Sequence, residues 1–331
     1  MQFKSGFVFG KFMPFHKGHE AMILFTASLC EKLYVIVCVS NKEQMPADLR
    51  KNWIANSFAD NLNIEVILFN YDEEKLSNSS ESSREISKTW AIEFKKLLPD
   101  VELLVSSEPY GDFVAEYMDI EHRFFDRARN KYPISASKIR SNPYENWEFL
   151  PDAVKPFYQL KVVILGTEST GKTTLSAYLS NYINAPLVKE MGRELIPNSE
   201  QFEMDDLKRV AAAHQFETEL ALKRLKPLII MDTDIHITQS YAIYKFGQYL
   251  DLPEQWYETQ KASLYLYLSK DSPYEQDGSR MTEDDRNKLD GFHRKTLEKF
   301  GIQYTTLSTD FESRKQDAIR LIYKLLGVES L

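Results

Sequence analysis

The segment KVVILGTESTGKTTL contains a glycine-rich stretch with the spacing of a phosphate-binding loop. Its residues fit G-x-x-x-x-G-K-[ST] without a departure. Glycines allow the tight turn that points backbone N–H groups at phosphates, and the following helix adds its dipole. We expect Lys172 to reach the β- and γ-phosphates and the Thr173 hydroxyl to ligate Mg²⁺. The expected ATP-binding residues are Gly166, Glu168, Ser169, Thr170, Gly171, Lys172, Thr173 and Thr174.

An acidic residue at the end of another apolar run should complete this site. Asp232 ends LIIMD, and we assign it the second contact to Mg²⁺. Asp234 is a secondary candidate for substrate or base, and it equally fits a helix cap. Downstream, the charged segment DGSRMTEDDR resembles a lid. Arg280 is best placed there to cover the transferring phosphate, with Arg286 as the alternative; simple pairing with the surrounding acids is the third interpretation.

A second constellation lies in GKFMPFHKGHE, residues 10–20, which places His16 and His19 where a strand turns into a helix. No third ligand of the right kind lies nearby and H-E-x-x-H is absent, so we do not expect zinc. Structural imidazoles that cap a helix remain an open alternative. Because Pro14 fixes a turn and Gly18 allows close approach at a helix N-terminus, we expect an anion site. Both imidazoles would donate hydrogen bonds to phosphates.

A third polar cluster occurs in PISASKIRSNP, at another expected helix start. It offers the hydroxyls of Ser135 and Ser137 together with the cations Lys138 and Arg140. Hydroxyl groups and a planar guanidinium suit phosphate oxygens. We therefore expect this segment to clamp phosphate.

Strand-like apolar runs alternate with helical patterns along the chain and must position these motifs. Such alternation indicates parallel βαβ units. Two prolines, Pro151 and Pro156, interrupt the periodicity in residues 149–160, just before the pattern restarts. We therefore expect two α/β domains, residues 1–150 and 158–331, each with a doubly wound parallel sheet. The expected strands are residues 6–10, 33–39, 64–69, 101–105, 161–166, 227–232, 264–269 and 302–307.

The composition is that of an acidic globular chain of 331 residues with a net charge of −8. It has no basic arm, so nucleic acid is not an expected partner and an anionic ligand needs a local site. No apolar run reaches membrane-spanning length, and the start lacks the core of a signal peptide. Cys30 and Cys38, in an expected helix and strand, indicate reduced thiols. We expect a cytoplasmic protein with no membrane contact.

GKFMPFHKGH resembles the G-x-F-x-P-x-H-x-G-H motif of the nucleotidyltransferase superfamily, and ISASKIR resembles its I-S-[ST]-[ST]-x-[IL]-R element, with Ala136 as a departure. A P-loop kinase segment follows these two motifs. In this arrangement the chain resembles the bifunctional nicotinamide-mononucleotide adenylyltransferase/ribosylnicotinamide kinases of the NadR type. SSEPYG (106–111) and KEMGRELI (189–196) also resemble that family. The resemblance implies a Rossmann-like transferase domain before a P-loop kinase domain. Some members carry a helix-turn-helix domain; because the first motif begins at Gly10, we expect none and no transcriptional role.

The resemblance implies two reactions of NAD biosynthesis. ATP phosphorylates ribosylnicotinamide to nicotinamide mononucleotide (NMN), and a second ATP adenylylates NMN to NAD with release of pyrophosphate. Mg²⁺ carried with ATP is the implied cofactor, and a homo-oligomer is compatible with the sequence. The implied catalytic residues are His16, His19, Arg140, Lys172, Asp232 and Arg280, and the implied ATP contacts of the transferase are Gly10, Lys11, Phe12, Gly18, Ser135 and Ser137.

The acceptor sites are less sharply indicated. Glu190 and Asp232 are candidates to orient sugar hydroxyls or accept the proton, and Arg193 to hold substrate. A flat pyridine ring packs favourably against an aromatic side chain. Trp53 is the candidate for this contact in the transferase, and Trp256 is the candidate in the kinase. Two other functions stay open: transfer to another acceptor such as pantetheine phosphate or a flavin, and nucleotide sensing with weak turnover.

Overall fold

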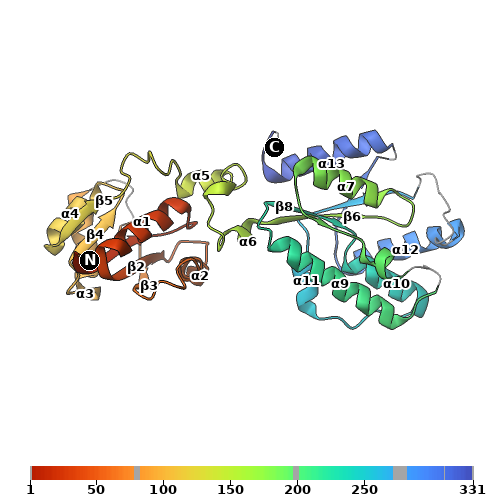
Figure 1. Ribbon diagram of the computed structural model, residues 1–331, viewed down its shortest axis with the longest axis horizontal. Coiled ribbons are helices and arrows are strands. Elements are labelled where there is room, and N and C mark those ends of the chain that lie inside the picture. Colours follow the sequence, from red (N-terminus) through yellow and green to blue (C-terminus); the bar gives the residue numbers. More distant parts are fainter. Residues whose placement is uncertain (1, 78–82, 197–200, 271–281, 309, 330–331) are drawn as a thin grey trace. The chain divides into compact units, whose positions relative to one another are not determined.

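The computed structural model describes residues 2–77, 83–196, 201–270, 282–308 and 310–329 (Figure 1). The chain divides into two compact units, Met1–Lys155 (unit 1) and Pro156–Leu331 (unit 2). The division falls within the proline-containing segment 149–160. Each unit is built around a five-stranded sheet whose paired strands all run parallel. The predicted α/β fold with two parallel sheets is confirmed.

Unit 1 has the strand order β3-β2-β1-β4-β5. Its order reverses at β1, which pairs with β2 on one side and β4 on the other. Ligands of such sheets bind at the carboxyl ends of the strands beside this switch point. The strands are β1 (Phe3–Gly10), β2 (Cys30–Ser40), β3 (Ile64–Tyr71), β4 (Leu103–Ser106) and β5 (Glu121–Phe124). The helices are α1 (Lys17–Leu29), α2 (Ala47–Ser57), α3 (Arg84–Leu97), α4 (Tyr110–Met118), α5 (Ala136–Ser141), the short 3-10 helix η1 (Trp147–Phe149) and, across the boundary, α6 (Lys155–Tyr158).

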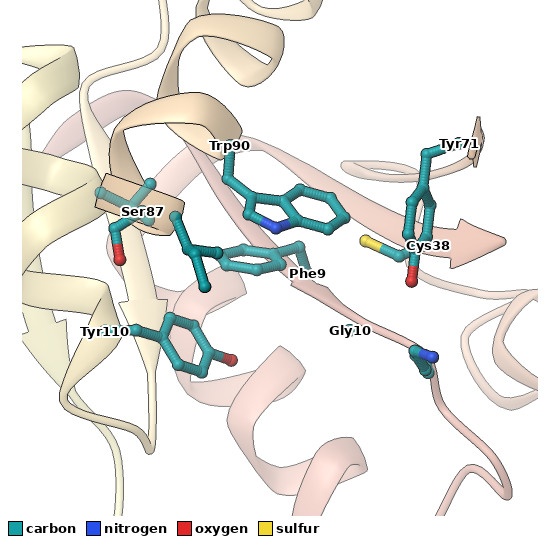
Figure 2. A pocket seen from close by; sticks show the side chains of 10 residues that line it. Phe9, Gly10, Cys38, Tyr71, Ser87, Trp90 and Tyr110 are labelled. Atoms are coloured by element: carbon teal, nitrogen blue, oxygen red, sulfur yellow. The ribbon is translucent and has the colours of Figure 1, made fainter. Parts of the chain in front are cut away.

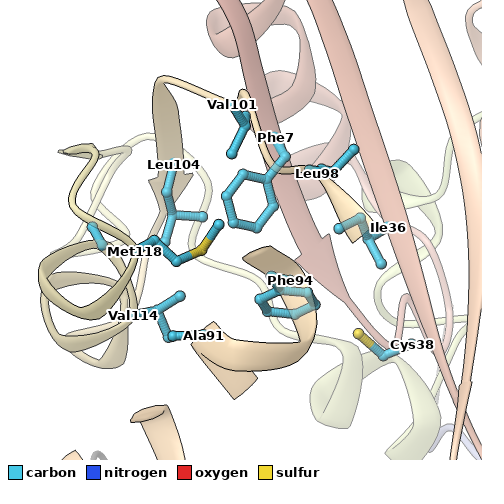
Figure 3. Packing of buried hydrophobic residues seen from close by; sticks show 11 residues of the cluster. Phe7, Ile36, Cys38, Ala91, Phe94, Leu98, Val101, Leu104, Val114 and Met118 are labelled. Atoms are coloured by element: carbon cyan, nitrogen blue, oxygen red, sulfur yellow. The ribbon is translucent and has the colours of Figure 1, made fainter. Parts of the chain in front are cut away.

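The core on one face of this sheet is aromatic and aliphatic (Figure 3). Phe7 of β1 meets Phe94 of α3 with ring centroids 5.4 Å apart, in an edge-on contact. Met118 of α4 and Leu104 of β4 belong to the same cluster. Burying such side chains contributes about 1.5–3 kcal/mol each. Helices α3 and α4 are thereby held against β1 and β4, and β1 leads into the first expected transferase motif.

Unit 2 has the strand order β10-β9-β6-β8-β7, again with all pairs parallel. The order reverses at β6, which lies between β8 and β9 and leads into the phosphate loop. The strands are β6 (Leu160–Leu165), β7 (Leu187–Val188), β8 (Leu228–Asp232), β9 (Leu264–Leu268) and β10 (Thr305–Leu307). The helices are α7 (Lys172–Ile183), α8 (Met191–Leu195), α9 (Met204–Leu222), α10 (Ile235–Phe246), α11 (Glu254–Gln260), α12 (Glu283–Lys299) and α13 (Phe311–Leu326).

Two edge strands were not expected from the sequence. β5 reads EHRF, and β7 has two residues, so neither presents an apolar run. Cys30, expected in a helix, instead begins β2, and both cysteines are buried free thiols. Among the helices of the described residues, none is long and apolar enough to cross a bilayer.

Two candidate nucleotide sites

A cavity of about 560 Å³ opens at the carboxyl end of β1 in unit 1. Small-molecule sites commonly have volumes of this order. Arg140 donates a hydrogen bond to the Met13 carbonyl and so joins segments 127 residues apart. The structure thus brings the two transferase motifs together. The sequence-predicted residues that line the cavity are Gly10, Lys11, Phe12, His16, Gly18, His19, Ser135, Ser137 and Arg140.

The histidine pair is stacked, with ring centroids 3.6 Å apart and planes inclined by 19°. His16 Nδ1 accepts a hydrogen bond from the His19 backbone N–H at 3.3 Å and caps α1, so the capping alternative is correct for this nitrogen. Neutral His16 therefore carries its proton on Nε2. His19 Nδ1 is buried, with no hydrogen-bond partner among the described residues.

Both imidazoles are uncharged at neutral pH in the free protein. Burial lowers the pKa of His16 to about 4, assisted by the charge of Arg129. Burial lowers the pKa of His19 well below its usual value, and the charges of His16 and Arg129 add to the effect. The pair can donate N–H groups to phosphate oxygens but brings no positive charge. Positive charge must come from other side chains of the cavity or from a bound cation.

The second motif forms part of the opposing wall. Ser135 accepts a hydrogen bond from the Lys138 backbone N–H at 3.3 Å and caps α5. Ser137 Oγ accepts one from Arg140 Nη2 at 3.0 Å, so the guanidinium is held between Ser137 and the Met13 carbonyl. Lys138 donates instead to the Pro133 carbonyl at 3.3 Å and is not among the residues that line the cavity.

Lys11 lies in an acidic surrounding at the edge of the cavity. Its Nζ is 2.9 Å from Glu43 and 3.2 Å from Glu73. Burial would lower the pKa of Lys11, but the Glu43 and Glu73 carboxylates and Tyr71 together raise it. Arg50, which is fully buried, donates to the Lys11 carbonyl at 2.6 Å and to Glu43 at 2.7 Å. Arg50 thus fixes the backbone of the first motif, a role that no sequence pattern indicated.

A second, smaller pocket of about 150 Å³ adjoins this cavity (Figure 2). Trp90 and Phe9 lie nearly parallel in it, with ring centroids 6.2 Å apart, and Tyr110 lies beside Phe9. Phe9, Gly10, Lys11 and Tyr110 line both spaces, so the two lie next to each other. Trp53 of α2, expected as the aromatic partner, is 3% exposed and lines neither space. The aromatic side chains that line the smaller pocket include Trp90 and Tyr110.

Another part of the wall of the large cavity comes from two segments, residues 106–110 at the end of β4 and residues 125–129 after β5. Ser106 Oγ lies 3.0 Å from His122 Nε2, and His122 Nδ1 lies 2.7 Å from Asp112. A side chain at Gly111 would overlap Ser106 and His122, so this position requires glycine. At the rim, Arg129 Nη2 forms an ion pair with Glu108 at 2.7 Å.

In unit 2 the glycines of the phosphate loop have the backbone geometry that their spacing indicates. Gly166 has φ +142°, and a Cβ there would lie 2.8 Å from the Leu268 carbonyl oxygen. Gly171, with φ +87°, immediately precedes α7, whose first turn contains Lys172, Thr173 and Thr174. The Lys172 side chain is buried and donates to the Thr167 carbonyl at 3.1 Å.

Carboxylates and cations gather beside this loop. Asp232, at the end of β8, is 1% exposed, and its Oδ1 lacks a hydrogen-bond partner among the described residues. Burial and the Glu190 carboxylate raise the pKa of Asp232 to about 6, against the opposing influence of Lys172, Thr173 and Arg193. These interactions place the predicted substrate and metal residues in one cluster. Among the described residues, no three His, Cys, Asp or Glu side chains form a metal site by themselves.

The other residues predicted for the kinase site lie in different surroundings. Asp234 caps α10 through the His236 and Ile237 N–H groups, so its capping interpretation is correct. Arg280 lies outside the described residues. Arg286 is buried and donates to the Lys270 carbonyl at 2.5 Å. Trp256 is half-buried in α11.

Two further side chains contact the phosphate loop, and neither was predicted from the sequence. Arg314 of α13 is buried and donates to the Thr170 carbonyl at 2.7 Å and to the Ser308 carbonyl at 2.6 Å. Tyr241 of α10 donates to Glu168 of the loop at 3.2 Å. Neither belongs to a local motif, since each reaches the loop from a distant helix.

Two parallel-sheet units, each with phosphate-binding features at the carboxyl ends of its strands, define a two-domain nucleotide-binding protein. Residues 161–314 match the family model described as an AAA domain. The match covers most of unit 2 and includes the phosphate loop and Arg314.

Comparison with individual proteins extends the likeness to unit 1. The chain is 27% identical to the trifunctional NAD biosynthesis/regulator protein NadR of Escherichia coli strain K12, over 97% of this chain and 83% of that protein. A crystal structure of NadR protein in complex with NAD and AMP-PNP superposes with a TM-score of 0.73 and 23% identity, covering 99% of this chain and 97% of that one. Phosphopantetheine adenylyltransferase of Mycoplasma mycoides is 28% identical over 40% of this chain and 90% of its own length. The predicted resemblance to the NadR type is confirmed.

Proposed function

We propose that this chain is a bifunctional enzyme of NAD biosynthesis. Unit 2 phosphorylates ribosylnicotinamide with ATP, and unit 1 adenylylates the resulting NMN with a second ATP to give NAD and pyrophosphate. The observation that carries the proposal is that one chain holds two separate phosphate-binding arrangements, one in each unit. The likeness to a NAD biosynthesis protein over 97% of the chain supports the same reactions.

In unit 1, an NMN phosphate oxygen attacks the α-phosphorus of ATP, and the bond from that phosphorus to the pyrophosphate oxygen breaks. No enzyme nucleophile is needed. The neutral His16 and His19 present N–H groups to the phosphates, and the Arg140 guanidinium balances the negative charge that develops. Fixed donors aimed at developing charge commonly account for a large part of such a rate enhancement.

The pocket of Phe9, Trp90 and Tyr110 suits the pyridine ring of NMN. Flat rings pack favourably on aromatic faces, and this pocket opens beside the phosphate-binding cavity. We therefore assign the ring to Trp90 in place of Trp53.

In unit 2, Lys172 would neutralise the β- and γ-phosphates while the 5′-hydroxyl of ribosylnicotinamide attacks the γ-phosphorus. The unpartnered carboxylate oxygen of Asp232 and the hydroxyl of Thr173 form the oxygen donor set that Mg²⁺ prefers, so these two residues would hold it. When bound, Mg²⁺ supplies positive charge to the β- and γ-phosphate oxygens. Glu190 or Asp232 would accept the hydroxyl proton, and Arg193 would hold substrate.

Arg280 remains the proposed cation over the transferring phosphate. We further propose that the protein acts in the cytoplasm on these small molecules, with neither nucleic acid nor membrane as partner. A homo-oligomer is compatible with both sites as described, since each is built within one unit.

The test is to incubate the protein with Mg-ATP and ribosylnicotinamide and to separate the products over time. Accumulation of NMN followed by NAD supports both activities. NMN without NAD assigns only the kinase, and conversion of supplied NMN but not of ribosylnicotinamide assigns only the transferase. Absence of both products contradicts the proposal and favours nucleotide sensing.

A second candidate for unit 1 is adenylylation of pantetheine phosphate, which the similarity to the Mycoplasma mycoides enzyme favours. The aromatic pocket opposes it, because the pantetheine chain has no flat ring to place against Trp90. Supplying pantetheine phosphate and NMN in parallel reactions with Mg-ATP separates the two acceptors. Faster pyrophosphate release with pantetheine phosphate would overturn the proposed substrate.

A further inference from the structure

The charge balance of the transferase cavity is incomplete without one more cation. Both histidines are neutral, Lys11 lies between Glu43 and Glu73, and Arg140, which is held by two uncharged oxygens, supplies a single positive charge. ATP brings about four negative charges, and the leaving pyrophosphate carries its own. Electrostatic stabilisation of phosphoryl charge normally needs cationic side chains that can turn toward it.

Arg129 is the cationic side chain of the cavity that remains available. It lines the same cavity as the two histidines, and its charge acts on both imidazoles. Its side chain is 47% exposed, and its ion pair within the described residues is with Glu108, itself 43% exposed. Exposed ion pairs are weak, so this one can be exchanged for a phosphate at little cost.

The backbone below Arg129 is firmly held although its side chain is exposed. The Asp126 carboxylate accepts hydrogen bonds from the N–H groups of Asn130, Lys131 and Tyr132, at 2.9–3.2 Å. Arg129 itself has φ +52°, a left-handed conformation uncommon for arginine and often found at functional sites. A rigid turn therefore presents a side chain that can swing between Glu108 and the cavity.

We propose that Arg129 is a catalytic residue of adenylyl transfer, held by Glu108 in the free protein and released to the phosphates of ATP on binding. The proposal rests on the adenylyl transfer proposed above. In the bound state the guanidinium would contact β- or γ-phosphate oxygens and stabilise the departing pyrophosphate. Glu108 competes with ATP for the same guanidinium, so the two residues should have opposite effects on ATP use.

The experiment measures kcat and KM for ATP in NAD formation from NMN, using the full chain. Arg129→Ala should lower kcat/KM about 100-fold, as expected for one lost contact to the reacting charge, and Arg129→Lys should recover part of it. Glu108→Gln should lower the KM for ATP by about 1.4- to 5-fold, the range that corresponds to an exposed ion pair. Arg127→Ala is the matched control: it removes the same charge two residues away, from an exposed side chain outside the cavity.

The opposite signs separate catalysis from a merely structural role. If Arg129→Ala and Glu108→Gln both raise the KM for ATP, the ion pair holds the cavity wall and the proposal is wrong. If Arg129→Ala changes kcat/KM for ATP no more than Arg127→Ala does, Arg129 has no role in the reaction. Phosphorylation of ribosylnicotinamide by the same samples should stay within twofold of wild type, because Arg129 lies in unit 1.

A binding readout keeps this proposal distinct from the proposed function. Hydrogen exchange of peptides covering residues 126–132 is followed while α,β-methylene-ATP is titrated. The analogue should protect these peptides at lower concentration in Glu108→Gln and at higher concentration in Arg129→Ala than in wild type. That pattern in a protein that makes no NAD would refute the proposed function but support phosphate capture by Arg129; equal midpoints in all variants would refute the capture.

Discussion

Replacing His16 by asparagine should remove a pH dependence from the stability of unit 1. His16 is 5% exposed, and its Nδ1 accepts the hydrogen bond that caps α1. Asparagine is among the best N-cap residues and does not titrate, so the change can keep the cap while removing the proton site. Burial lowers the pKa of native His16 to about 4, whereas the unfolded chain has an ordinary value of 6.5.

The sign and the size follow from these two pKa values. Below pH 6.5 the unfolded chain binds more protons than the native one, so the free energy of unfolding falls as the pH falls from 6.5 toward 4. One pKa unit corresponds to about 1.4 kcal/mol, which makes the loss roughly 2 kcal/mol at pH 5 and about 3 kcal/mol at pH 4, with a limit of about 3.4 kcal/mol at still lower pH. The variant His16→Asn has no titrating group at this position, so its free energy of unfolding does not show this fall. The stability of wild type relative to the variant should therefore drop by about 2 kcal/mol between pH 7.5 and pH 5.

Urea unfolding followed by tryptophan fluorescence measures this difference. Three of the four tryptophans, Trp53, Trp90 and Trp147, lie in unit 1, so the signal reports mainly on that unit. Taking the difference between wild type and variant at each pH cancels the titration of the groups that His16 does not influence. A difference that stays constant from pH 7.5 to pH 5 would refute the claim that His16 is held neutral by burial.

Three further predictions concern the two units. Lys172→Ala should slow ribosylnicotinamide phosphorylation by roughly two to three orders of magnitude and leave NAD formation from supplied NMN intact. His19→Ala should show the reverse and accumulate NMN. Loss of both activities in folded Lys172→Ala would contradict two separate sites. Arg314→Ala should destabilise unit 2 by about 2 kcal/mol in thermal or urea unfolding and raise the KM for ATP in phosphorylation only, because it removes charged hydrogen bonds to the Thr170 and Ser308 carbonyls. A fragment of residues 156–331 should fold and phosphorylate ribosylnicotinamide without making NAD; an unfolded fragment by circular dichroism would show that unit 2 needs unit 1.

Local chemistry explains which parts of the sites were predictable. The phosphate loop depends on backbone conformations that glycine permits at Gly166 and Gly171, and on a helix that starts at Lys172. Ser135 and His16 act as helix caps within three residues of their partners. Such features depend on neighbours in the chain, and a sequence pattern therefore records them.

The alternation of apolar runs and helical patterns likewise determined both parallel sheets, whereas the short edge strands β5 and β7 escaped notice. EHRF of β5 is mostly polar and β7 has only two residues, so neither offers the apolar run that marked the other strands. The amino-acid sequence by itself therefore determined the central strands, the phosphate loop and the ends of the motif helices.

The tertiary structure alone decided which side chains share a cavity. The sequence analysis named Trp53 as the ring partner, but packing puts Trp53 into the core and Trp90 into the pocket beside the first motif. Arg314 reaches the Thr170 carbonyl across 144 residues, and Arg129 meets Glu108 across 21. Contacts over such separations depend on how helices and strands pack against one another, and no local spacing encodes that packing.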